Sequence, residues 1–71
     1  MQAHEIMNTA HNANDAIARA ETEDPCIFQD WDSETTLFRF ADGSVLAVSG
    51  PQCNAYDDED DAGEDFPGML D

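Results

Sequence analysis

The sequence contains no lysine, and its basic residues other than histidine are Arg19 and Arg39. Against these two stand 17 Asp and Glu, so the formal net charge is -15 with both histidines neutral. A surface this negative repels the phosphates of nucleic acids and the headgroups of anionic lipids. Direct binding to nucleic acid or to a membrane surface is therefore disfavoured, and the expected partner is basic.

Cysteine is scarce and long apolar runs are absent. Cys26 and Cys53 are too few for a disulfide framework, and we interpret both as small buried hydrophobic residues. No segment approaches the roughly 20 apolar residues of a membrane-spanning helix. Residues 1–5 lack the basic and apolar regions of a signal peptide. The sequence therefore predicts a cytoplasmic protein.

The chain of 71 residues holds one small domain at most. High net charge usually indicates disorder, but 41% of the residues are hydrophobic and they occur in patterned blocks with Phe28, Trp31, Phe38 and Phe40. We expect a single α+β domain over residues 1–56. An acidic C-terminal segment over residues 57–71 is expected to be mobile.

The first half of the predicted domain has helical periodicity. Apolar residues recur along residues 3–20 at the spacing of one face of a helix, which predicts one N-terminal helix. Pro25 prevents its continuation. The apolar stripe consists of Ala3, Ile6, Met7, Ala10, Ala13, Ile17 and Ala20.

After Pro25 the pattern is typical of strands. Residues 26–31, 35–40 and 44–49 predict a three-stranded antiparallel sheet against which the helix packs. A three-residue loop with Gly43 in the left-handed conformation pairs Phe38 with Leu46 and gathers the largest apolar side chains on one face. The other face is then only half covered. Residues 52–56 are expected to form either an irregular segment or an edge strand.

Residues 57–65 carry seven carboxylates and resemble a calcium-binding loop at first sight. In the register starting at Asp57, the sixth position is Ala62 instead of glycine, and the twelfth is Gly68 instead of glutamate. The run is compatible with weak, non-selective binding of divalent cations. It does not predict a dedicated metal site, and no cofactor is expected.

Groups suited to catalysis are equally scarce. His4 and His11 lie two helical turns apart, with no further ligand at metal-binding spacing, and both are expected to be exposed and without chemistry. No lysine and no glycine-rich phosphate loop is present. The sequence therefore does not predict an enzyme.

The charge itself remains as the functional signal. Duplex DNA carries one negative charge per ~1.7 Å of helix axis, so about 15 charges correspond to roughly 25 Å of duplex. A compact chain of this length has about that diameter. Solubility alone needs a net charge of only about 2 to 8. The composition therefore indicates imitation of nucleic acid towards a basic partner.

The carboxylates expected to bind that partner lie near the first strand turn, in the acid run and after the predicted helix. The candidate residues are Asp30, Asp32, Glu34, Asp57, Asp58, Glu59, Asp60, Asp61, Glu64 and Asp65, extended by Glu21, Glu23 and Asp24. Those near the strands are expected to hold fixed, phosphate-like positions, and those of the acid run to contribute mainly to attraction.

Motifs along the chain also resemble a known family. Residues 40–46, Phe-Ala-Asp-Gly-Ser-Val-Leu, precede Ser49-Gly50, Gln52 and the acid run, while Ala16-Ile17-Ala18 and Trp31-Asp32 come before them. In this order the motifs resemble small phage-encoded anti-CRISPR proteins of the DNA-mimic type, which act on type I-F-like or I-C-like surveillance complexes.

The resemblance implies a helix with a three-stranded antiparallel sheet, and an acidic surface that occupies the DNA-entry and PAM-reading site of such a complex. Its contacts would be lysines of a Cas8-like subunit and its neighbours, in the cytoplasm of the host cell. The alternative from the residues is a DNA-mimic decoy for another basic protein, such as a restriction or nucleoid protein.

Overall fold

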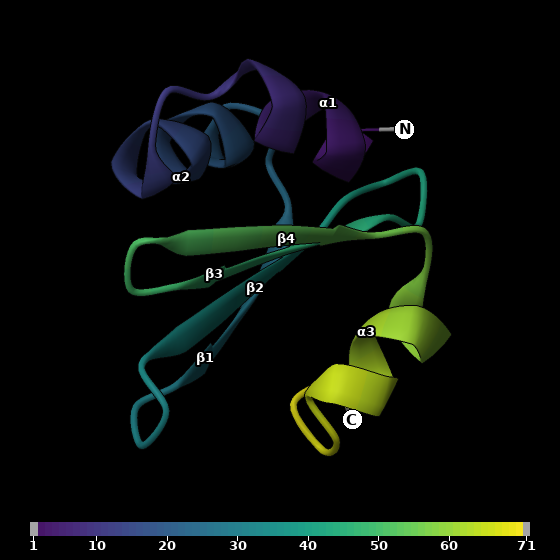
Figure 1. Cartoon of the computed structure of the whole chain (residues 1–71). Coiled ribbons are helices and arrows are strands. Elements are labelled where there is room, and N and C mark those ends of the chain that lie inside the picture. Colours follow the sequence, from purple (N-terminus) through teal and green to yellow (C-terminus); the bar gives the residue numbers. More distant parts are fainter. Residues whose placement is uncertain (1, 71) are drawn as a thin grey trace.

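The computed structural model of the chain describes residues 2–70. Met1 and Asp71, which end the predicted segments 1–56 and 57–71, lie outside the described residues. The α+β class is confirmed, with a sheet between two helical layers (Figure 1). In chain order the elements are α1 (Gln2–Thr9), α2 (Ala13–Glu21), β1 (Cys26–Asp30), β2 (Thr35–Arg39), β3 (Val45–Ser49), β4 (Gln52–Tyr56) and α3 (Glu59–Asp65).

The sheet is an antiparallel meander with the strand order β1-β2-β3-β4. Phe38 pairs with Leu46, as predicted, and Gly43 has a φ of 91°, which glycine adopts without strain. The predicted sheet of three strands is one strand short: residues 52–56, expected as an irregular segment or an edge strand, form the edge strand β4, which pairs with β3 from Gln52 to Tyr56. Polar residues alternate with small ones in β4, so its strand pattern is weak.

The single predicted N-terminal helix is two helices. Asn12 caps α2 by accepting a hydrogen bond from the Asp15 backbone N–H at 2.8 Å, and the Asp15 carboxylate accepts one from the His11 N–H at 2.9 Å. This reciprocal cap begins a new helix where the apolar spacing alone predicts continuation. The apolar face is kept, because residues from both helices pack on the same side of the sheet.

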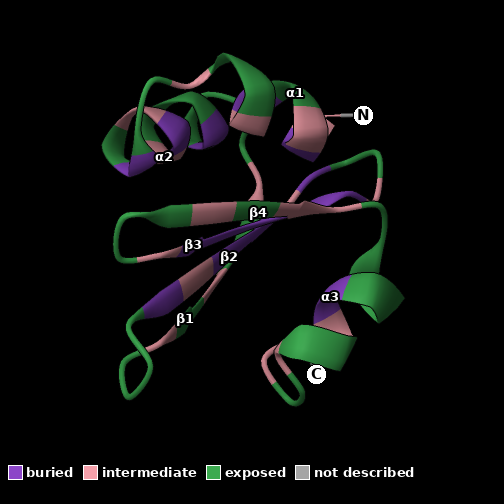
Figure 2. Cartoon of the chain, viewed as in Figure 1, coloured by how far each residue is buried: buried purple, intermediate pink, exposed green. Residues whose placement is uncertain are grey.

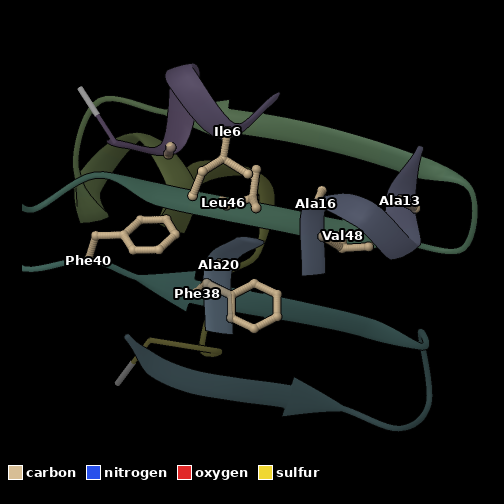
Figure 3. Close-up of a cluster of buried hydrophobic side chains, with 9 residues drawn as sticks. Ile6, Ala13, Ala16, Ala20, Phe38, Phe40, Leu46 and Val48 are labelled. Atoms are coloured by element: carbon tan, nitrogen blue, oxygen red, sulfur yellow. The ribbon is translucent and has the colours of Figure 1, made fainter. Parts of the chain in front are cut away.

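Helices α1 and α2 cover β3 and β4 on one face of the sheet. Phe38, Phe40, Leu46 and Val48 project from that face towards the two helices (Figure 3). Small residues, Ala3, Ala13, Ala16 and Ala20, form most of the buried helix surface. Alanine lets the helices approach the sheet closely, so a chain this short can still form a packed core.

The opposite face of the sheet is covered by α3 and the residues that follow it. Leu37, Val45 and Ala47 are almost completely buried there, together with Ala62 of α3. Phe66 and its C-terminal neighbours pack against the same cluster. The expectation of a half-covered face followed by an acidic tail was therefore wrong, because the acid run forms a helix that supplies the missing cover.

The β1–β2 hairpin reaches away from the helices, and its turn is fully exposed (Figure 2). Trp31, counted among the apolar blocks from the sequence, is 80% exposed, and Ile27 is 52% exposed. Cys26 is exposed too, which corrects its interpretation as a buried residue, because β1 is an edge strand outside the helical cover. Cys53 is partly buried, and both thiols are free.

The packing of α3 can be tested at two adjacent residues. Ala62→Glu places a charge in a completely buried position, and we expect it to lower the free energy of unfolding by at least about 2 kcal/mol. Gly63→Ala is the matched control: an added methyl group meets no atom within 4 Å and favours the helix, so stability should rise by about 0.5–1 kcal/mol. Urea unfolding measures both. Equal stability of the Glu variant and the original chain would mean that α3 does not dock.

Candidate acidic binding surface

The predicted carboxylates are divided between the two ends of the sheet. Strand β1 starts at Cys26, opposite Arg39, and ends at Asp30, opposite Thr35, so its ends lie about 13 Å apart. Asp30, Asp32 and Glu34 belong to the far end, which we call the hairpin tip (residues 30–34). We call the acids around the β2–β3 turn at the other end the acidic rim: Glu23, Asp24, Asp42, Asp57, Asp58, Glu59 and Asp60.

The acidic rim is assembled from distant parts of the sequence. Asp24 and Glu59 line one open surface hollow beside Gly43 of the β2–β3 turn. Asp58, Glu59 and Asp60 line a neighbouring hollow that includes the same glycine. The β2–β3 turn therefore lies between the acids that follow α2 and those that begin α3, and the structure brings the two groups together.

Asp42 is the centre of this arrangement and was not among the predicted residues. Its carboxylate accepts hydrogen bonds from the Gln2 backbone N–H at 2.9 Å, the Ser44 N–H at 2.9 Å and the Ser44 hydroxyl. These bonds lower the pKa of Asp42 to about 2, and the bond from the Gln2 N–H has the largest effect. Ser44 Oγ in turn accepts from the Ala3 N–H at 3.1 Å, so the β2–β3 turn caps the first turn of α1.

Few of the carboxylates are neutralised within the chain. Among residues 2–70, ion pairs join Glu59 to Arg39 at 3.3 Å and Asp15 to Arg19 at 3.0 Å, and a hydrogen bond of 2.9 Å joins Asp57 Oδ1 to His4 Nε2. His4 therefore contacts the residues just before α3, whereas the sequence predicted an exposed side chain without a contact. The other acids of the rim and tip have no basic partner in this part of the chain, so their charge faces solvent.

The hairpin tip is held by its own hydrogen bonds. Asp30 accepts from the Asp32 backbone N–H at 3.1 Å and from the Ser33 hydroxyl at 2.9 Å. The carboxylate of Asp30 thus maintains the turn, while Asp32 and Glu34 are exposed. Glu34 has a φ of 55°, a conformation disfavoured for a side chain of this kind. A charged residue therefore occupies a position where glycine would fit without strain.

The remaining predicted acids lie along α3 and at the end of α2. Asp58 caps α3 by accepting from the Asp61 N–H at 2.9 Å. Asp65 accepts a hydrogen bond from the Tyr56 hydroxyl; burial, together with this bond, raises the pKa of Tyr56 to about 12. Exposed positions without such a role in the described range are Glu21, Asp61 and Glu64.

Two residues of this surface were missed by the sequence reasoning. Asp42 belongs to an Asp-Gly turn, where an acid normally has a purely local role, so its link to α1 had no signal in the sequence. Trp31 has the composition of a core residue, and only the position of β1 at the sheet edge leaves it exposed.

Other kinds of site were also sought in the described chain. Within residues 2–70, no three His, Cys, Asp or Glu side chains gather as the ligands of a metal ion would. None of the helices in that range is both long and apolar enough to cross a membrane. Comparison of the chain with protein-family models, with curated proteins and with solved structures found no match.

The role of Asp42 predicts a specific acid sensitivity. Since its pKa is lowered from 3.8 to about 2, its stabilising effect is complete above about pH 4 and is lost as the pH falls through 2. The difference in unfolding free energy between the original chain and Asp42→Asn should therefore shrink from pH 5 to pH 2 in urea titrations. A difference that is constant with pH would contradict the capping role of the ionised carboxylate.

The strained position of Glu34 predicts a gain in stability on substitution. Glu34→Gly removes the strain of a positive φ, and we expect the free energy of unfolding to rise by about 0.5–1 kcal/mol. Asp32→Gly, in the same turn but without a positive φ, should not gain. Destabilisation by Glu34→Gly in urea unfolding would show that the glutamate side chain contributes to the fold.

Proposed function

We propose that the chain is an anti-CRISPR inhibitor that imitates DNA. Its acidic surface occupies the basic DNA-binding and PAM-reading site of a type I surveillance complex and prevents binding of target DNA. The partner is the basic surface of a Cas8-like subunit and its neighbours, and the function requires no catalysis, metal or cofactor. The sequence motifs that resemble anti-CRISPR proteins of this type supply the choice of target.

The observation that carries the proposal is a set of carboxylates held on a rigid scaffold, most of them without basic partners in the described residues. The chain measures 28 × 25 × 18 Å along its principal axes, and its net charge of -15 equals that of roughly 25 Å of duplex. Backbone N–H groups fix Asp30, Asp42 and Asp58 in place. A basic groove shaped for phosphates would meet a similar density of negative charge over a similar length.

The division into rim and tip favours a two-point contact. Seven acids gather at one end of the sheet and three at the other, with the length of a strand between them. The major groove of DNA is about 12 Å wide, which is close to the roughly 13 Å between the ends of β1. The two acidic ends can therefore imitate the phosphates that border a groove, while the strands between them take the place of the base pairs.

Competition with DNA tests this function. A purified type I-F or I-C surveillance complex carrying its guide is incubated with fluorescent target duplex, and the chain is titrated in at several salt concentrations. We expect displacement of the duplex, with an apparent affinity that weakens at least about tenfold between 50 and 200 mM salt because the contact is ionic. Inhibition that is unaffected by salt would contradict DNA mimicry.

Neutralised variants locate the contact. Asp60→Asn/Asp61→Asn/Glu64→Gln removes one exposed charge of the rim and two next to it on α3 without changing the capping residue Asp58, and Asp32→Asn/Glu34→Gln removes two from the tip. Each should weaken competition and reduce its salt dependence, while Glu5→Gln, an exposed acid outside both ends, should not. If the chain does not displace DNA from the complex but does so from a restriction or nucleoid protein, the decoy function on that protein replaces the present proposal.

A further inference from the structure

The exposed indole of Trp31 has no role in the packing described above. Trp31 is the sole tryptophan of the sequence, and 80% of its surface is accessible to solvent. Helices α1 and α2 on one face and α3 on the other all pack mainly against β3 and β4, and the β1–β2 turn extends beyond them (Figure 1). A large aromatic side chain left in water contributes little to folding, whereas in an interface it is often a main source of binding energy.

The turn that carries Trp31 is rigid enough to present it. Asp30 accepts hydrogen bonds from Asp32 and from the Ser33 hydroxyl. Ser33 Oγ lies 3.1 Å from Thr35 Oγ1, which lies 3.4 Å from Ser49 Oγ. Thr35 is itself buried, so these contacts connect the tip to the ends of β2 and β3. A side chain on such a turn loses little conformational freedom on binding.

The chemistry around Trp31 selects a cation. Asp32 and Glu34 are exposed on the same turn, within three residues of the indole. An apolar partner would have to desolvate both carboxylates without compensation, which is unfavourable. A cation over the ring can instead interact with the π system and with a neighbouring carboxylate at the same time.

The chain already contains one such arrangement, formed by residues of β1, β2 and α3. The guanidinium carbon of Arg39 lies 5.4 Å from the centre of the Phe28 ring, and Nη1 of the same group is 3.3 Å from Glu59 Oε2. Arg19, the other arginine, is paired with Asp15. The hairpin tip thus offers a ring and carboxylates, while both arginines of the chain are engaged elsewhere.

We propose that the hairpin tip is an arginine-binding element: a guanidinium group of the partner stacks on Trp31 and donates hydrogen bonds to Asp32 or Glu34. This proposal rests on the proposed function and specifies the partner surface, which must present arginine at this point. Lysine can satisfy the carboxylates, but its compact ammonium group lacks the planar face that stacks on an indole. Within residues 2–70 the acidic rim has no exposed aromatic side chain of this kind, so we expect it to prefer arginine over lysine less strongly than the tip does.

Peptides of equal charge test the proposal without a surveillance complex. Octa-arginine and octa-lysine are titrated into the purified chain at low salt, with calorimetry for affinity and tryptophan fluorescence for contact at the tip. We expect octa-arginine to bind several-fold more tightly and to change the emission of Trp31 at saturation. In Trp31→Leu the preference for arginine should fall about two- to fivefold, the range expected for an exposed cation–π contact.

Two further variants separate stacking from charge. Trp31→Phe keeps a ring and should retain part of the preference, whereas Asp32→Asn/Glu34→Gln should weaken both peptides and keep the change in Trp31 emission. Thermal unfolding followed by circular dichroism should be unaltered in Trp31→Leu, because the side chain is exposed.

Three results would overturn the arginine-binding proposal: no binding of octa-arginine, the same preference in Trp31→Leu as in the original chain, or an unchanged Trp31 emission at saturation. The outcome is independent of the competition assay. If the chain binds octa-arginine through Trp31 but does not displace DNA from the complex, the arginine-binding proposal holds and the proposed target is wrong.

Discussion

The burial of β3 on both faces is the constraint on which the rest of the structure depends. Val45, Leu46, Ala47 and Val48 alternate between the two sides of the sheet, and none is more than 4% exposed. One helical layer can cover only one of these sides. The chain therefore needs α3 as well as α1 and α2, and it has only the acid run from which to build it. The acidic segment, which the sequence analysis separated from the folded domain, thus forms the helix that covers one face of the sheet.

Much of the fold follows from the sequence, and the exceptions have physical causes. The strand periods predicted β1 to β3, and the Gly43 loop predicted the register of β2 with β3, because a one-residue shift would move Phe38 and Leu46 away from the helices. The helix break needed the cap formed by Asn12 and Asp15, a pair that apolar spacing ignores. For α3 the apolar signal was weak: of the residues that cover this face, only Ala62 lies inside the helix, and Phe66, Met69 and Leu70 follow its end.

The candidate surface was less accessible to sequence reasoning than the fold. Which residues carry charge is plain from the sequence, but their grouping into a rim and a tip depends on the direction of β1 and on the contact between α1 and the β2–β3 turn. Trp31 shows a second difficulty, because the local sequence does not distinguish an aromatic residue that is buried in the core from one that is exposed at a sheet edge. Its exposure is decided by which strands the helices cover.

A chain almost without cations must stabilise its carboxylates by other means, and backbone N–H groups serve this purpose. Asp42 accepts from the start of α1, Asp15 from the backbone just before α2, and Asp58 from the first turn of α3. Each of these carboxylates interacts favourably with the positive end of a helix dipole, and of the three only Asp15 also has an arginine as its partner, Arg19. Because N–H groups carry no net charge, the field outside the molecule stays negative. Helix capping thus allows one fold to be stable and to present a strongly negative surface.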